Sequence, residues 1–340
     1  MTDRCFRVAG VQSAPIFLDL AATVDKAIGL IEEAAKADAR LIAFPEVWLP
    51  GYPWWIWLGS PAWGLQFMKR YHLNAMSRDG REMRALCDAA RRHKIFVALG
   101  YAERGGGSLY MAQSLIDDRG KPVFHRRKLK PARTERSVFG EGDGSHLCVA
   151  ETDIGRVGAL CCGEHFQPLS KYAMYSQQQE IHAAAWPGFS LLRGKAFLNG
   201  PQAALVATQM YAIEGQCFAI AATTVNDEAM LSVVCDTPER RAMLTVDGKA
   251  AAGGATMIFG PDGRPLTDPL PEDEEGIVYA DIDLETLFLA KTAADATGHY
   301  ARPDVLRLLF DRRPAPNVMG FDAAMDVADL AEPAWTGHEG

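Results

Sequence analysis

The chain has 340 residues, 48% of them hydrophobic and 23% charged, which is the balance of a soluble globular protein with a sizeable core. The formal net charge of −8 argues against nucleic acid as a partner, because phosphate binding needs a basic surface. No run approaches the roughly 20 apolar residues that span a bilayer, and the charged start, Met1–Arg7, lacks the apolar core of a signal peptide. We therefore expect a cytoplasmic protein that binds no membrane.

The first half of the chain alternates between strand and helix patterns. Apolar runs predict strands at 6–12, 40–44, 95–101, 108–116 and 122–128. Helical periodicity predicts helices over 20–39 and 80–93. The turn sequence at 117–120 predicts that the last two strands form a hairpin. Two loops complete this half, an aromatic one at 48–63 and a longer one at 130–146.

The second half repeats this rhythm. Its predicted strands are 156–161, 181–185, 218–225, 256–259 and 277–282, and its predicted helices are 167–177, 202–215 and 284–293. Two similar halves of a mixed α/β chain indicate two sheets packed face to face with helices outside. No linker divides the chain, so we expect one domain over 1–310. An irregular tail rich in Pro, Ala and Asp follows at 311–340.

The seven cysteines are odd in number and scattered, which does not indicate a disulfide framework. No two of them are separated by two residues, and the histidines are dispersed, so we expect no structural zinc site. Most of the cysteines should be small buried hydrophobic residues.

Glu46 follows the predicted strand 40–44, with Pro45 between them, and precedes the aromatic loop. A carboxylate at such a strand end is poorly solvated, which raises its pKa and suits it to act as a general base. On this segment alone, a surface glutamate at a strand end is the better interpretation.

A basic cluster ends the predicted strand 122–128. Side-chain alternation puts Arg126, Lys128 and Lys130 on one face and Arg127 on the other. An inward lysine can stabilise a developing anion or lower the pKa of a thiol. A solvated basic edge strand explains most of the cluster equally well, so we expect only one or two of these residues to be catalytic.

Two adjacent cysteines, Cys161 and Cys162, end the predicted strand 156–161 and are followed by Gly163. Neighbouring strand residues point to opposite faces, so one cysteine can belong to the core while the other faces a site. A cysteine at a strand-to-helix turn is partly exposed and near the positive end of the helix, and both effects favour the thiolate. Taken alone, the pair fits two buried core cysteines better.

Together the three segments resemble the nitrilase superfamily, in which Glu, Lys and Cys occur in this order along the chain. The resemblance runs from Val8 to about Leu309. It rests on three stretches that stand where the family has its signatures: Phe44–Glu46, Arg127–Pro131 and Cys162–Leu169. Further stretches indicate the bacterial nitrilase branch: Pro50–Pro53, Gly140–Ser145, Ala185–Gly188 and Gly298–Asp304.

The resemblance implies an α/β fold, the four-layer αββα sandwich of that superfamily. It implies a nitrilase that converts an organic nitrile into the carboxylic acid and ammonia through thioimidate and thioester intermediates on Cys162. It assigns Glu46 as the base and Lys128 as the cation beside the developing charge, while Glu135 matches the second family glutamate, which positions Lys128 or water. It also implies no metal, no organic cofactor, and a homo-oligomer of dimers that stack into spirals.

Two positions depart from the bacterial pattern, which usually has Trp where this chain has Gly163 and Thr where it has Ala132. Glycine opens space beside the thiol, so we expect a pocket for aromatic, arylaceto- or other bulky nitriles, with an altered ratio of acid to amide. The residues expected to bind substrate are Tyr52, Gly163, Trp186 and His165. The spacing of His165 also suggests a Cys–His pair, but the resemblance gives the base to Glu46, which leaves His165 a supporting role.

Three other functions remain open. An aliphatic amidase or carbamoylase would use the same Glu-Lys-Cys triad, as would a cyanide-hydrolysing enzyme. A non-catalytic binding or assembly protein could use the same scaffold, although the intact triad argues against it.

Overall fold

The computed structural model describes residues 4–191 and 197–316. The helices are α1 (Leu20–Lys36), α2 (Pro61–Asn74), α3 (Arg81–His93), α4 (Pro168–Tyr175), α5 (Pro201–Gly215), α6 (Glu228–Val234), α7 (Pro238–Met243) and α8 (Leu287–Ala294). The strands of the first half are β1 (Cys5–Ser13), β2 (Ala39–Ala43), β3 (Phe96–Gly105), β4 (Ser108–Ile116), β5 (Pro122–Arg127) and β6 (Phe139–Gly140). Those of the second half are β7 (Val149–Thr152), β8 (Gly155–Cys161), β9 (Ile181–Trp186), β10 (Phe218–Thr224), β11 (Thr245–Val246), β12 (Lys249–Ala250), β13 (Met257–Phe259) and β14 (Gly276–Asp283).

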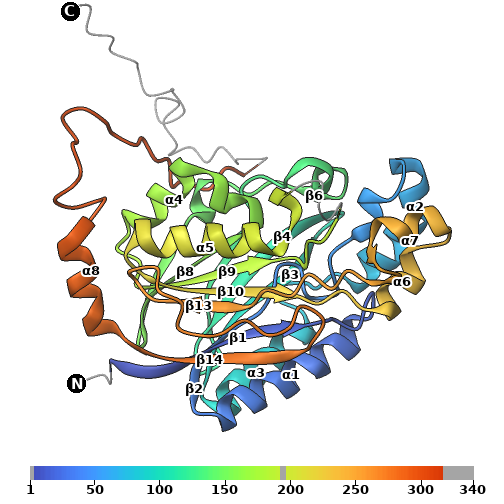
Figure 1. The fold of residues 1–340 in the computed structure, drawn as a ribbon, viewed down its shortest axis with the longest axis horizontal. Helices are drawn as coiled ribbons and strands as arrows, with labels where there is room; N and C mark the ends of the chain where they lie inside the picture. The colour runs from blue at the N-terminus through green and yellow to red at the C-terminus, as the bar shows by residue number, and fades with distance from the viewer. Residues whose placement is uncertain (1–3, 192–196, 317–340) are drawn as a thin grey trace, which may run out of the picture.

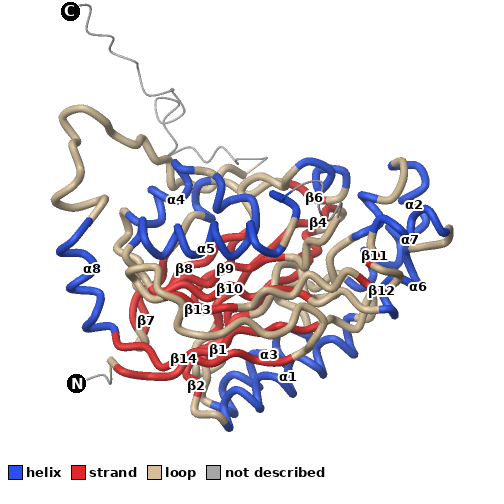
Figure 2. Tube along the Cα trace, in the orientation of Figure 1, coloured by secondary structure: helices blue, strands red, loops and turns tan. Residues whose placement is uncertain are grey.

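Most strands belong to one continuous sheet whose two halves face each other (Figure 2). One half runs β5-β4-β3-β2-β1 and the other β10-β9-β8-β7, while β14 pairs with β1 and β13 with β10. Strands β1 and β10 join the halves through a short parallel seam, Gln12 to Thr223 and Ser13 to Thr224. Beyond that seam the halves diverge and pack face to face.

Helices cover both outer faces, which confirms the expected four-layer αββα sandwich. In Figure 1, α1 and α3 lie below the first half of the sheet, and α4 and α5 lie above the second half. The alternation of β2 explains the layers, because Leu41 belongs to the cluster between the two halves of the sheet and Ile42 to the cluster between the sheet and α1. Helix α1 begins where the Asp19 side chain accepts a hydrogen bond from the Ala22 amide, and it buries an apolar stripe that includes Ile31.

The hairpin of β4 and β5 and most other predicted elements are confirmed within a few residues. Helix α2 was not predicted: its first three residues fell in the predicted loop 48–63, and no element was predicted over 64–79. Ser60 caps this helix and Pro61 stands in its first turn. The short helices α6 and α7 were not predicted either. Residues 311–316 of the expected tail contain no helix or strand, and 317–340 lie outside the described residues. Within the described ranges, no helix combines the length and apolar character needed to cross a bilayer.

Candidate active site

Strand direction brings the three predicted catalytic residues to one end of the sandwich. Six successive strands of the sheet run in the same direction, each parallel to the next: β8, β9, β10, β1, β2 and β3. Strand β4 is antiparallel to both β3 and β5, so β5 runs in the same direction as β2 and β8. Glu46, Lys128 and Cys162 each follow the carboxyl end of one of these strands, and the carboxyl ends of parallel strands share one edge.

The backbone at Glu46 is held between the two halves of the sheet. Its amide lies 3.4 Å from the carbonyl oxygen of Trp186 at the end of β9. A side chain at Gly100 of β3 would place its Cβ 2.0 Å from the Pro45 carbonyl oxygen. Only glycine at this position lets the Glu46 segment pack directly over β3.

Lys128 lies between two carboxylates in the interior. Its Nζ donates to Glu46 Oε1 and to Glu135 Oε2, both at 2.8 Å, and all three side chains are buried. Glu135 also accepts a hydrogen bond from the Tyr52 hydroxyl at 3.0 Å and one from the Ala132 amide at 2.6 Å. Three donors therefore fix the Glu135 carboxylate and, through it, the position of the ammonium group.

Burial changes the protonation of this cluster. It raises the pKa of Glu46 to about 8, although Lys128 opposes the rise. Burial alone would lower the pKa of Lys128, but Glu135 and Glu46 hold it well above its ordinary value. The second carboxylate oxygen of Glu46, Oε2, is buried and has no hydrogen-bond partner among the described residues. A buried carboxyl group with one unpaired oxygen is suited to exchange a proton with a reacting group.

Cys162 begins a short 3-10 helix (Cys162–Phe166) directly after β8. Its φ of +37° lies in the left-handed region, which is costly for a residue with a side chain and persists only where the surroundings enforce it. Burial raises the pKa of its thiol well above the ordinary value, and Glu46 adds to the rise, while Lys128 and the Gly163 amide oppose it. The expectation that Cys162 is partly exposed and that its position favours the thiolate is wrong, because the side chain is buried and burial outweighs the groups that lower its pKa.

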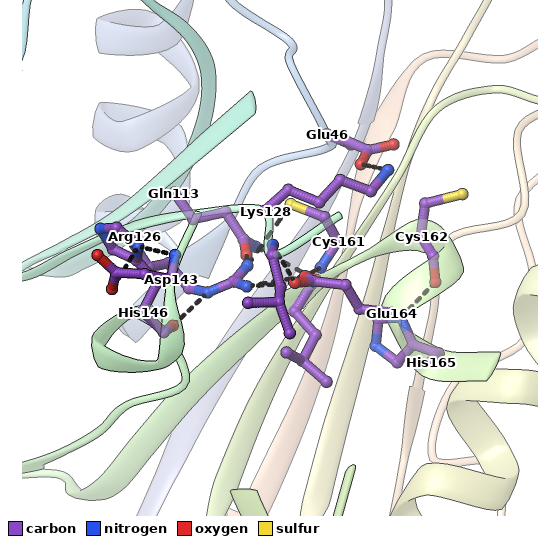
Figure 3. A network of polar contacts seen from close by, with 12 residues as sticks. Glu46, Gln113, Arg126, Lys128, Asp143, His146, Cys161, Cys162, Glu164 and His165 are labelled. Carbon is purple, nitrogen blue, oxygen red and sulfur yellow. Dashed lines mark hydrogen bonds and ion pairs between the residues drawn. The ribbon is translucent and has the colours of Figure 1, made fainter. Parts of the chain in front are cut away.

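A buried ion pair holds the ends of β5 and β8 together, as Figure 3 shows. Arg126 Nη2 donates to both carboxylate oxygens of Glu164, at 2.6 and 2.8 Å. Glu164 also accepts hydrogen bonds from the backbone amides of Leu129 and Cys161, each at 2.8 Å. One carboxylate thus fixes the residue after Lys128 and the residue before Cys162.

The sequence placed Arg126 on the face of Lys128 but did not identify this pair. Arg126 and Lys128 are both buried, as the alternation predicts, but Lys130 departs from it because β5 ends at Arg127. Lys130 is exposed and pairs with Glu141, and Arg127 pairs with Glu103 at 2.6 Å.

A pocket of about 100 Å³ opens at Cys162. Its walls are mostly apolar or aromatic and include Trp57, Phe166, Trp186, Phe189 and Leu198, with Glu135 and Gly163 also in the lining. Two of the four residues expected to bind substrate, Gly163 and Trp186, therefore line it. Tyr52 is absent from the lining, and its hydroxyl contacts Glu135 instead; Trp57, which donates to that hydroxyl, lies at the wall.

His165 lies outside the pocket lining. Its ring is buried and stacks on the Trp186 ring, with 4.8 Å between centroids. Its Nδ1 lies 2.8 Å from the carbonyl oxygen of Cys162, so it contacts the backbone of Cys162 and not its sulfur. Among the described residues, no cluster of three or more His, Cys, Asp or Glu side chains has an arrangement suited to hold a metal ion.

The sequence of residues 7–291 matches the family model of the carbon-nitrogen hydrolases. The chain belongs to the carbon–nitrogen hydrolase family. Among the relatives of this hydrolase is a nitrilase of Pseudomonas syringae pv. syringae (strain B728a), which is 52% identical over 95% of this chain and 93% of its own. An aliphatic nitrilase of Rhodococcus rhodochrous is 50% identical over 91% and 83%, and an arylacetone-specific nitrilase of Alcaligenes faecalis is 48% identical over 91% and 86%.

Solved structures of other family members share the fold of this hydrolase. A carbon–nitrogen hydrolase from Helicobacter pylori G27 superposes with a TM-score of 0.67 at 18% identity, over 85% of this chain and 93% of its own. A mutant amidase from Nesterenkonia sp. AN1 superposes with a TM-score of 0.62 at 16% identity, over 83% and 95%. At this level of identity the likeness concerns the fold alone.

Proposed function

We propose that this carbon–nitrogen hydrolase is a nitrilase that hydrolyses an organic nitrile to the carboxylic acid and ammonia. The observation that carries the proposal is the buried Glu46–Lys128–Glu135 cluster, whose Glu135 lines a mostly apolar pocket together with Cys162. Relatives that are 48–52% identical over nearly the whole chain carry the name nitrilase, which supports the same activity here.

In the first step, the thiol of Cys162 adds across the nitrile. The sulfur bonds to the nitrile carbon, and Glu46 accepts the thiol proton and delivers it to the nitrile nitrogen, which gives a thioimidate. Burial keeps the resting thiol protonated, so this transfer accompanies the attack. Lys128 stabilises the negative charge that develops on nitrogen, and Glu135 holds Lys128 in place.

In the second step, water attacks the thioimidate carbon and gives up a proton to Glu46. The tetrahedral intermediate expels ammonia after its nitrogen is protonated, and a thioester remains on Cys162. A second water cleaves the thioester, which releases the carboxylic acid and restores the thiol. The two-step route replaces one slow hydrolysis with two faster ones and needs no cofactor.

For the substrate, we propose aromatic, arylaceto- or other bulky nitriles. The ring-lined walls suit an apolar group, and the wall beside the thiol is open at Gly163. A Cβ at Gly163 would find one neighbour within 4 Å among the described residues, the Cβ of Ala132 at 3.7 Å. Both positions that depart from the bacterial pattern therefore border the same space.

Replacement of Cys162 by alanine tests the proposal. The variant should release no ammonia from any nitrile that the wild type converts, and turnover near the wild-type rate would refute the mechanism. Aliphatic amidase, carbamoylase and cyanide-hydrolysing activities are the alternatives. Ammonia released from a nitrile but not from the matching amide excludes the amidase. A preference for a large nitrile over cyanide excludes the cyanide-hydrolysing enzyme.

We also propose that the protein is a cytoplasmic homo-oligomer. Helix α5, on the outside of the sandwich, exposes Val206, Met210 and Ile213, and α4 exposes Leu169. Apolar side chains at this spacing on an outer helix are typical of a subunit contact. In a sedimentation experiment, the wild type should behave as an assembly and the Val206→Glu variant as a smaller species.

A further inference from the structure

The imidazole of His165 connects the peptide of Cys162 to a buried chain of polar groups. Its Nε2 lies 2.9 Å from Nε2 of His182, and Nδ1 of His182 lies 2.8 Å from Nε2 of Gln179. The same amide nitrogen donates to the carbonyl oxygen of Ile181 at 2.9 Å. The three side chains are 2% exposed or less. The chain therefore runs from one backbone carbonyl, at Ile181, to another, at Cys162.

One arrangement of protons satisfies every contact in this chain. Carbonyl oxygens only accept, so Gln179 must turn its NH2 group toward Ile181, and its second hydrogen then points to Nδ1 of His182. His182 consequently carries its proton on Nε2 and donates to Nε2 of His165. His165 carries its proton on Nδ1 and donates to the carbonyl oxygen of Cys162, at 2.8 Å.

Both imidazoles are neutral and held in place by rings. Burial lowers the pKa of His165 to about 4 and that of His182 well below its ordinary value. The His182 ring stacks on Tyr211, with 3.7 Å between centroids and 20° between planes. Because both nitrogens of His165 already have partners, it has no free position for a proton from the Cys162 sulfur. A Cys–His pair is therefore excluded.

The peptide that accepts this hydrogen bond also carries the amide of Gly163. The Gly163 amide lowers the pKa of the Cys162 thiol, against the larger effect of burial. A hydrogen bond to the carbonyl side of a peptide polarises the group and strengthens donation from its N–H side. The left-handed φ of Cys162 makes the orientation of this peptide costly, so it requires an external support.

We propose that the chain His165–His182–Gln179 is a positioning device for the nucleophile. It holds and polarises the Cys162–Gly163 peptide so that the Gly163 amide faces the sulfur. The proposal rests on Cys162 as the nucleophile. It makes His165 a positioning residue that acts through the backbone, whereas the sequence suggested a residue near the substrate.

Two substitutions of His165 separate positioning from packing. His165→Asn keeps a side-chain N–H near the Cys162 carbonyl but removes the ring, and His165→Phe keeps a ring but removes the donor. The readout is the rate at which iodoacetamide alkylates Cys162 between pH 6 and 10, followed on the Cys162 peptide by mass spectrometry. His165→Phe should slow alkylation at pH 8 about tenfold, the effect of one buried hydrogen bond, and shift the pH profile to higher pH. His165→Asn should keep most of the wild-type alkylation rate. Faster alkylation in His165→Phe than in His165→Asn would overturn the proposal.

A second pair keeps the test decisive if His165 variants do not fold. His182→Phe retains the stack on Tyr211 but removes the donor to His165, and should lower alkylation and kcat about tenfold with little change in KM. The matched control is Tyr211→Phe, which removes the hydrogen bond from the Tyr211 hydroxyl to Gln179 Oε1 but keeps the ring stacked on His182. Gln179 remains oriented by the Ile181 carbonyl, so this variant should react within about twofold of the wild type.

A folded His182→Phe variant with unchanged alkylation and kcat would refute the positioning role. Alkylation needs no nitrile turnover, so this result is independent of the proposed function. Failure of the wild type to hydrolyse nitriles would refute that function and leave the alkylation test intact.

Discussion

Gly163 lies against Ala132 at the wall of the pocket: a Cβ at Gly163 would be 3.7 Å from the Cβ of Ala132. The space beside the thiol is therefore bounded by two small residues from separate segments. Tryptophan at Gly163 would fill it, so Gly163→Trp should lower kcat/KM for bulky or α-substituted nitriles by about 10- to 100-fold relative to slim ones. Kinetics with a matched pair of nitriles, with acid and amide measured separately, provides the test.

The control for this prediction is Ala132→Thr, which adds a smaller group from the other side. It should change the selectivity in the same direction and by less. Unchanged selectivity and an unchanged product ratio in Gly163→Trp would show that this space does not hold the substrate.

Removing the charge of Glu135 should impair turnover more than binding. Lys128 would lose one of its two carboxylate partners, so Glu135→Gln should lower kcat by about 100-fold or more with a smaller change in KM. Tyr52→Phe removes one hydrogen bond to the same carboxylate and should cost only a few-fold. Equal losses in the two variants would contradict a role for Glu135 in placing Lys128.

The pH dependence should follow Glu46. A base must be deprotonated, and burial raises the pKa of Glu46 to about 8, so kcat/KM should fall as the pH decreases below that value. The charge of Glu135 contributes to the rise, so the acid limb in Glu135→Gln should move to lower pH. Rate profiles from pH 5 to 9 measure both effects, and a limb at the same pH in the two proteins would exclude this assignment.

Breaking the Arg126–Glu164 pair should destabilise the whole protein. Both groups are buried, so Arg126→Met leaves an unpaired buried carboxylate and should lower the free energy of unfolding by about 3–5 kcal/mol. Denaturation in urea measures the change. The exposed pair of Arg302 and Asp304 is the matched control, and Arg302→Met should cost less than about 1 kcal/mol.

Local patterns predicted most of the sandwich because strand alternation and helix periodicity are properties of neighbouring residues. Leu41 and Ile42 face opposite layers, as a period of two requires. The same reasoning missed α2, since no element was predicted over 64–79 and Pro61 was interpreted as part of a loop, although proline is well tolerated in the first turn of a helix. The pocket lining was predicted only in part, for a different reason: whether Tyr52 or Trp57 reaches the cavity depends on packing between distant segments.

By itself, the sequence determined the order of Glu46, Lys128 and Cys162 and their positions after strands, which is enough to indicate the family and its chemistry. The tertiary structure decided which basic residue is buried between two carboxylates, that burial raises the pKa of the Cys162 thiol, and that His165 contacts the backbone carbonyl of Cys162. Burial and distance between remote segments set pKa values and hydrogen-bond partners, and neither is encoded in the spacing of residues along one strand. Only the folded chain therefore shows that Gly163 and Ala132 border one space.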